Sequence, residues 1–144
     1  MRSINKIINR VNRNGLKFGN WEYYRSDGVL CFKGTYKNGE REGYWEYYYD
    51  NGELVSKGTY KNGEREGYWE YYYDNGELEY KGSYKNGLEN GIWEYYDDDG
   101  IINSKGLYRD DNREGIWEYY KRDGSNSSRE LYEGGNYIKS ILGV

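Results

Sequence analysis

The sequence has no histidine and no proline, and it contains one cysteine among its 144 residues. Without histidine it lacks the commonest general base, the usual activator of a nucleophile and the commonest metal ligand. Cys31 has no partner for an internal disulfide and no base to activate its thiol. The sequence therefore predicts a protein that is not an enzyme, with no catalytic residue, cofactor or metal.

Apolar residues are scarce as well, at 35% of the chain, and the mean hydropathy is −1.24. Such values are typical of disordered chains. Aromatic residues nevertheless make up 19%, with 21 tyrosines. Because these rings bury large areas while the tyrosine hydroxyl stays polar, they suit a thin layer better than a thick core. We expect an ordered, elongated protein.

Charges of both signs are mixed along the repeats. The formal net charge is −4, and lysine and arginine alternate with aspartate and glutamate. We therefore expect no basic stripe and no direct binding of nucleic acid. The chain also has no apolar run typical of a signal peptide or of a transmembrane segment, which predicts a cytoplasmic protein.

A repeat of 24 residues organises what is present. Each copy opens with a tryptophan in the tetrapeptide Trp-Glu-Tyr-Tyr, at Trp21, Trp45, Trp69, Trp93 and Trp117. The second copy continues with Asn51-Gly52, Lys57-Gly58-Thr59-Tyr60, Asn62-Gly63 and Gly67. A fixed period of this length indicates a repeat array.

Each unit predicts two antiparallel strands, because its aromatic tetrapeptide lies between Asn-Gly turns. Five units then give a sheet of about ten strands. If Asn51-Gly52 is a two-residue loop, Glu46 faces Lys57 and Trp45 faces Gly58. We expect each tryptophan to pack over the glycine of its own hairpin. The predicted structural residues are the five tryptophans together with Gly34, Gly58, Gly82, Gly106, Tyr36, Tyr60, Tyr84 and Tyr108.

Side chains alternate across a strand, which separates two faces. The aromatic face carries Trp45, Tyr47, Tyr60 and their equivalents, and the mixed face carries Glu46 and Lys57 with theirs. Tyrosine on a rigid surface is typical of interface hot spots. Since rings on the aromatic face are expected to stack on one another, the candidates for binding a partner lie on the mixed face: Tyr24, Tyr48, Tyr72, Tyr96, Tyr120, Tyr44 and Tyr68.

The two ends differ from the repeats. Ser3 to Arg13 has apolar residues at helical spacing, which predicts an N-terminal helical cap over residues 1–13, with membrane-surface binding as an alternative. Residues 14–136 then form five to six repeats, and the aliphatic residues 137–144 form a C-terminal cap of one domain, 1–144. The acidic turn Asp97-Asp98-Asp99 lacks the ligand spacing of an EF-hand and predicts a solvated turn.

The pattern of Tyr-Tyr, Asp/Asn-Gly, Lys-Gly-x-Tyr and Asn-Gly-x-x-x-Gly-x-Trp resembles the bacterial variant of the MORN repeat over residues 14 to about 137. The matching positions are Gly34, Tyr36, Gly39, Gly43 and Trp45, with their equivalents. The resemblance implies an all-β fold: a single-layer, elongated, twisted antiparallel meander of β-hairpins with a groove. Proteins with this repeat variant include the YwqK-type antitoxin family, so the resemblance also implies a binding role.

These features predict a non-catalytic protein-binding module. The resemblance extends this to an antitoxin, immunity or inhibitor protein, whose protein partner would be a toxin or a nuclease. Binding of carbohydrate or of a membrane surface is the alternative. Association of two arrays through the aromatic face, as a homo-oligomer, stays open.

Overall fold

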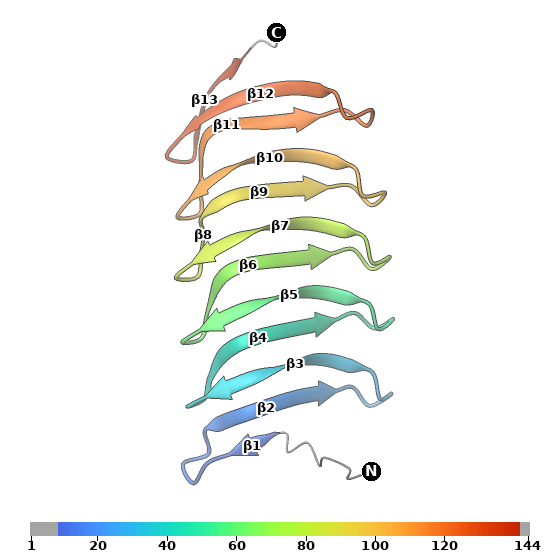
Figure 1. The fold of residues 1–144 in the computed structure, drawn as a ribbon, viewed down its shortest axis with the longest axis vertical. Helices are drawn as coiled ribbons and strands as arrows, with labels where there is room; N and C mark the ends of the chain where they lie inside the picture. Colours follow the sequence, from blue (N-terminus) through green and yellow to red (C-terminus); the bar gives the residue numbers. More distant parts are fainter. Residues whose placement is uncertain (1–8, 142–144) are drawn as a thin grey trace, which may run out of the picture.

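The computed structural model describes residues 9–141, and within that range every regular element is a β-strand. The strands form one antiparallel sheet of thirteen (Figure 1). Their bounds are β1 Arg10–Val11, β2 Lys17–Tyr24, β3 Leu30–Lys37, β4 Glu40–Tyr48, β5 Leu54–Lys61, β6 Glu64–Tyr72, β7 Leu78–Lys85, β8 Leu88–Glu89, β9 Gly91–Tyr96, β10 Ile102–Arg109, β11 Asn112–Tyr120, β12 Asn126–Glu133 and β13 Asn136–Ile141.

Strands that follow one another in the sequence lie side by side, so the predicted meander is confirmed. Figure 1 shows them stacked in order along the long axis of the molecule. The sheet has three strands more than the ten expected. Ten of the thirteen belong to the five two-stranded units, and the others are β1, β13 and the two-residue β8, which pairs with β7 where the fourth unit is irregular.

The predicted N-terminal helix is wrong for residues 9–13, and residues 1–8 lie outside the described range. Arg10–Val11 form β1, which pairs with Phe18 and Lys17 of β2. Asn9, at a φ of 56°, accepts a hydrogen bond from the Glu22 backbone N–H and donates one to its carbonyl, each of 2.9 Å. The free edge of β2 offers backbone partners, and pairing with it outweighs the weak helix preference of so short a segment.

At the other end, the segment predicted as a C-terminal cap begins as a further strand. β13 pairs with β12 through Glu133 and Asn136 and continues to Arg129 and Ile141. The ring of Tyr137 meets that of Tyr132 edge-on, with their centroids 5.9 Å apart. The aromatic packing of the repeats therefore extends onto the last strand.

The first turn of the unit is longer than predicted. Gly52 N–H donates to the Tyr49 carbonyl at 3.0 Å, and Tyr49 N–H donates to the Glu53 carbonyl at 2.8 Å, so three residues form the loop. Gly52 alone adopts a left-handed φ there, of 88°, which is the geometry of a turn followed by a bulge. A second bulge follows at Val55 and restores the predicted pairs, Glu46 with Lys57 and Trp45 with Gly58.

The second turn has the predicted two residues, with Asn62 and Gly63 at φ values of 50° and 82°. Its register nevertheless differs from the simple count. Between the pair Thr59–Glu66 and the pair Gly58–Trp69, a bulge leaves two residues of β6 without partners. Gly58 therefore lies opposite Trp69, whereas the simple count placed it opposite Gly67. Because the bulge shifts the pairing by an even number of residues, the two faces stay separate through the whole sheet.

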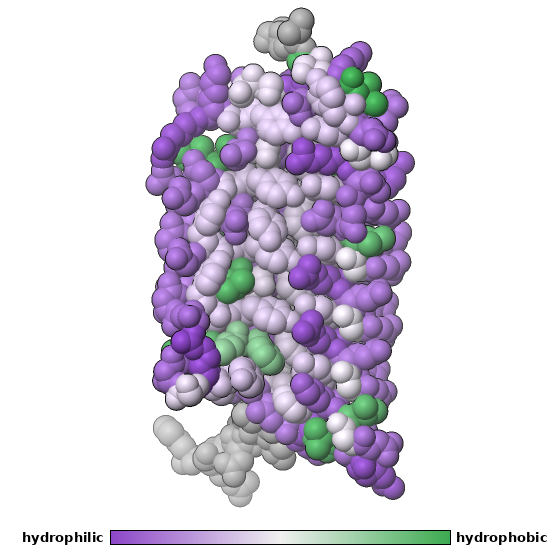
Figure 2. Space-filling view, turned by 180° about the vertical axis from the view of Figure 1, so that it is seen from behind, coloured by the Kyte–Doolittle hydropathy of each residue, from purple (hydrophilic) through white to green (hydrophobic). Residues whose placement is uncertain are grey.

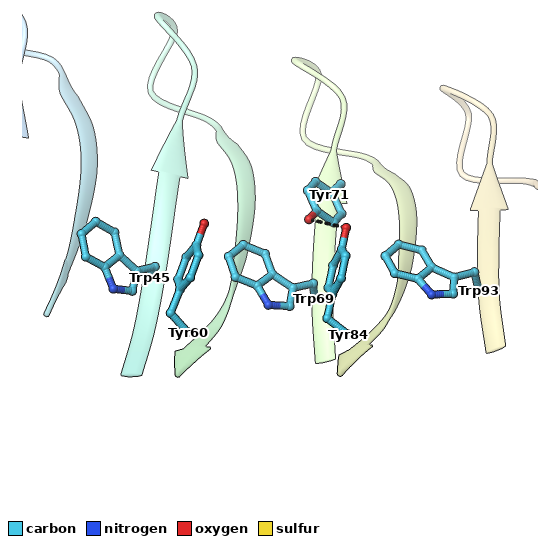
Figure 3. Close-up of a cluster of buried hydrophobic side chains, with 6 residues drawn as sticks. All are labelled: Trp45, Tyr60, Trp69, Tyr71, Tyr84 and Trp93. Atoms are coloured by element: carbon cyan, nitrogen blue, oxygen red, sulfur yellow. Dashed lines mark hydrogen bonds between the residues drawn. The ribbon is translucent and has the colours of Figure 1, made fainter. Parts of the chain in front are cut away.

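The core is a ladder of aromatic rings along one face. Trp45, Trp69, Trp93 and Trp117 are at most 1% exposed. Tyrosines alternate with them (Figure 3): the rings of Tyr60 and Trp69 meet at 87° with centroids 5.0 Å apart, and those of Tyr84 and Trp93 at 84° and 5.1 Å. Edge-to-face pairs of this kind stabilise beyond their buried area.

The expectation that each tryptophan covers the glycine of its own hairpin is wrong. A Cβ atom added to Gly58 would overlap Cδ2, Cε2 and Cγ of Trp69, and one added to Gly34 would overlap the same atoms of Trp45. The indoles of the second to fifth units thus cover the glycine of the preceding hairpin. Since Gly58 pairs with Trp45 on one side and Trp69 on the other, strand register alone does not choose between them.

Candidate functional site

The mixed face carries a cluster of three polar side chains that recurs in four units. In the central one, Lys57 Nζ lies 2.8 Å from Glu70 Oε2, and the Tyr72 hydroxyl donates to the same oxygen. Lys57 belongs to the hairpin that precedes the hairpin of Glu70. The sequence instead predicted that the charge of Lys57 pairs with that of Glu46 in its own hairpin. The equivalent clusters are Lys33, Glu46 and Tyr48; Lys81, Glu94 and Tyr96; and Lys105, Glu118 and Tyr120.

These clusters shift the ionisation of their members. Burial raises the pKa of Glu70, but hydrogen bonds from Lys57 and Tyr72 outweigh it, and the net pKa lies below its ordinary value. The hydrogen bond to Glu70 raises the pKa of Lys57. Each cluster thus keeps a lysine and a carboxylate charged together and links two neighbouring hairpins.

The lowered pKa of Glu70 predicts a pH dependence of stability. A carboxylate whose pKa is depressed in the folded state stabilises it above the unfolded pKa, about 4.3, and loses that contribution as pH falls through the folded value. We expect Glu70→Gln to lower the melting temperature at neutral pH, and the gap from wild type to narrow progressively as the pH falls below the unfolded pKa and through the lower folded pKa. Thermal melts over this range test it.

The control for this experiment is Glu64→Gln, at an exposed glutamate beside the Asn62-Gly63 turn. We expect its melting temperature to follow that of the wild type at every pH. If the Glu70 and Glu64 variants change in parallel with pH, the clusters do not contribute to stability through ionisation.

A row of large apolar side chains lies on the mixed face beside the clusters. We call it the exposed row; its members are Tyr44, Tyr68, Ile92 and Ile116, with 53%, 52%, 59% and 51% of their surface exposed. They stand one per unit, on β4, β6, β9 and β11. Tyr44 and Tyr68 were predicted to bind a partner, whereas the two isoleucines were missed, although their 24-residue offset from the tyrosines marks them in the sequence.

The other predicted partner-binding residues are placed differently. Tyr24 is 48% exposed, and its hydroxyl donates to Glu22. Four more tyrosines are partly buried, with their hydroxyls donating to the glutamates of the clusters: Tyr48, Tyr72, Tyr96 and Tyr120. All seven predicted residues therefore share the mixed face, in two rows with the Lys–Glu pairs between them.

The aromatic face is hollowed at two places. One position of the repeat carries a ring in some units and a serine in others: Phe32, Ser56, Tyr80, Ser104 and Ser128. A hollow of about 450 Å³ lies at Ser56 and one of about 360 Å³ lies at Ser104, and Tyr80 lines both. Figure 2 shows this face, where side chains of intermediate hydropathy run along the molecule between hydrophilic margins.

A row of cations lies on the same face, although the sequence predicted no basic stripe. Arg41 Nη1 donates to the Tyr60 hydroxyl and Arg65 Nη1 to that of Tyr84, each at 3.3 Å. Arg113 Nη1 donates to the hydroxyl of Tyr132 at 3.2 Å. Within the described part of the chain, none of the three arginines lies within 4.0 Å of a carboxylate. The row could not be recognised from the mixed charges of the sequence. Residues adjacent to each arginine along the strand lie on the opposite face, so they do not interrupt the row.

The fourth unit breaks this row. Glu89 stands where other units have Arg65 or Arg113; burial and the nearby Asp111 raise its pKa, against the lowering effect of the two arginines. The backbone also differs, because Asn90 N–H donates to the Ser83 carbonyl at 2.8 Å. In three other units the equivalent carbonyl accepts a hydrogen bond from the indole, whereas the buried Trp93 Nε1 has no hydrogen-bond partner among residues 9–141.

The acidic turn has its own internal partners. Carboxylate oxygens of Asp97, Asp98 and Asp99 lie within 4.8 Å of one another. Asp99 pairs with Arg122, and Asp97 Oδ1 accepts hydrogen bonds from the N–H groups of Asp99 and Ile101. The turn is thus held by protein contacts.

The fold and the period define a class: a linear array of β-hairpin repeats whose surfaces are built from equivalent residues of successive units. The model of the MORN repeat variant family matches residues 19–38, 41–62, 65–86 and 89–110, which is more than half of the chain. The chain belongs to this family. No curated protein matches it.

MORN repeats are generally modules that bind proteins or membranes, and the family is a non-enzymatic repeat module. None of residues 9–141 forms a helix that could cross a membrane. The family match ends at residue 110, but the unit that begins at Trp117 repeats the same hairpin in β11 and β12. The described array is therefore longer than the matched part.

Proposed function

We propose that the chain is a non-catalytic protein-binding module whose partner lies across the mixed face. The observation that carries this proposal is the exposed row. Single exposed apolar side chains are ordinary, but four in register, each more than half exposed, form a row of large side chains that a partner can contact along four units. Two rings and two aliphatic side chains would anchor the partner along four units.

Contacts between neighbouring hairpins hold this surface rigid. The Tyr49 hydroxyl donates to the Tyr72 carbonyl at 2.7 Å, and that of Tyr73 to the Tyr96 carbonyl at 2.9 Å. At the other side of the sheet, Gly63 N–H donates to the carbonyl of Arg41 at 3.0 Å. A surface that is already ordered loses little conformational entropy on binding, which favours affinity.

The kind of partner is narrowed by charge and by chemistry. The net charge of −4 favours association with a basic protein. Ile92 and Ile116 favour a protein over a carbohydrate, because sugars stack on rings and not on aliphatic side chains. We propose an antitoxin, immunity or inhibitor role, in which the array covers a basic surface of a toxin or nuclease.

The test uses two matched double variants. Tyr68→Ser with Ile92→Ser removes the centre of the exposed row, and Tyr137→Ser with Ile138→Ser removes side chains that are 54% and 46% exposed at the end of the array. The partner is first isolated by its binding to the tagged chain. Calorimetry is then expected to show that affinity for the partner falls roughly thirtyfold or more in the central double variant and under about fivefold in the end double variant.

Equal losses for the two pairs would contradict the proposal, because the apolar row would then contribute no more than any exposed side chain. Circular dichroism of both variants checks that the sheet is intact. All four substitutions are at exposed positions, so we expect both spectra to match that of the wild type.

A further inference from the structure

We propose that the hollow at Ser56 on the aromatic face is a second binding site, which takes carboxylate side chains from an acidic protein segment between Arg41 and Arg65. Both arginines line this hollow of about 450 Å³, together with Tyr47, Tyr60 and other rings. It lies on the face opposite the exposed row. The site is therefore distinct from the surface of the proposed function.

The two guanidinium groups are available to an anion. Both arginines are exposed and donate hydrogen bonds to tyrosine hydroxyls, while neither has a carboxylate within 4.0 Å in the described chain. A guanidinium has five N–H donors in a planar fork that fits a carboxylate. Most of the donors of Arg41 and Arg65 are thus left for a ligand.

Aromatic rings fix the direction of both forks. Arg41 Cζ lies 5.5 Å from the centroid of Trp45 and 5.1 Å from that of Tyr60, and Arg65 Cζ lies 5.2 Å from that of Tyr84. Contacts of this kind hold the side chain in place without neutralising its charge. The arginines are therefore oriented before any ligand arrives, which lowers the entropic cost of binding.

The hollow exists because a ring is missing. Ser56 is 6% exposed and occupies the position where Phe32 and Tyr80 carry rings. The Tyr47 and Tyr60 hydroxyls are bonded to each other at 3.2 Å on one side. The site thus offers an apolar wall for the methylene groups of a glutamate or aspartate and cationic donors for its carboxylate.

Glu89 favours an acidic protein segment over a polyanion with charge along its whole length. This half-buried carboxylate follows Arg65 in the row, and Asp110 and Asp111 lie in the turn beside it. A nucleic acid or polyphosphate that followed the row would meet this negative patch at close range. A protein segment avoids the repulsion by placing its acidic residues over β4 to β6 and neutral or basic residues over β8.

The experiment titrates the full chain with a blocked oligo-glutamate peptide at neutral pH and low salt, and follows tryptophan fluorescence and heat. We expect Arg65→Gln to weaken binding roughly tenfold or more, as loss of one partner of a close charge pair does. Arg65→Lys keeps the charge without the fork and is expected to lose about threefold. Glu89→Gln is expected to strengthen binding severalfold by removing the repulsion.

Two controls separate this site from other effects. Lys57→Gln removes a cation from the mixed face and is expected to leave the affinity within about twofold. The Tyr68→Ser, Ile92→Ser variant tests the proposed function and is expected to keep full affinity for the peptide. Circular dichroism checks that each arginine variant keeps its sheet.

Three results would overturn the proposal: no binding of oligo-glutamate to the wild type, equal losses for Arg65→Gln and Lys57→Gln, or tighter binding of inorganic polyphosphate than of oligo-glutamate. The last result would assign the row of arginines to phosphate. None of these outcomes bears on the partner of the mixed face.

Discussion

Trp69→Ala is expected to lower the free energy of unfolding by about 3–5 kcal/mol, the range found for removal of a buried aromatic side chain. Trp69 is 1% exposed and lies over Gly58. Its ring packs between Tyr60 and Tyr71, at centroid distances of 5.0 and 6.0 Å, and its Nε1–H donates to the Thr59 carbonyl at 3.0 Å. The substitution removes all of these contacts and leaves a cavity in the centre of the ladder.

Trp21→Ala is the matched control, because Trp21 opens the first unit in the same tetrapeptide. It is only half-buried, and its Nε1 has no hydrogen-bond partner within the described chain. We expect it to cost less than about 2 kcal/mol in urea unfolding. Equal losses of unfolding free energy for the two variants would show that a central tryptophan gains no extra stability from having aromatic rings on both sides.

Gly58→Val is expected to cost about 3 kcal/mol or more, although valine has the higher strand preference. The added Cβ would overlap the five-membered ring and fusion atoms of Trp69. Thr59→Val, one residue along β5 and on the exposed mixed face, is expected to change stability by less than about 0.5 kcal/mol. Comparable unfolding midpoints for the two variants would contradict the close packing of indole on glycine.

A double-mutant cycle identifies which tryptophan the glycine supports. If Gly58 supports Trp69, the cost of Gly58→Val falls by about 1–3 kcal/mol when Trp69→Ala is also present, because the cavity accepts the new side chain. The same cycle with Trp45→Ala is expected to show a smaller coupling. A larger coupling with Trp45 would restore the packing within one hairpin that the sequence suggested.

The sequence by itself determines the hairpin repeat and the composition of its two faces. The 24-residue period, the Asn-Gly dipeptides and the alternation of Trp45, Glu46 and Tyr47 define strands, turns and faces, because side chains alternate along any strand. Pairing within the hairpin, such as Glu46 with Lys57, agrees with the same local count, although the loop has three residues and a bulge at Val55 restores the register. Tyr44 and Tyr68 of the exposed row were predicted because they are tyrosines. Ile92 and Ile116 occupy the same position of the 24-residue repeat but were missed because they are not aromatic.

Tertiary structure decides what happens between hairpins. Each strand has two neighbouring strands, and bulges and twist determine which of the two a side chain contacts. Trp69 therefore covers Gly58, and Lys57 forms an ion pair with Glu70, in both cases across the boundary between two hairpins. The edge of β2 turns Arg10–Val11 into a strand where spacing favoured a helix. The row of Arg41 and Arg65 and the hollow beside it are built from side chains of successive hairpins, because pairing of β4 to β7 brings residues of neighbouring units together on one face.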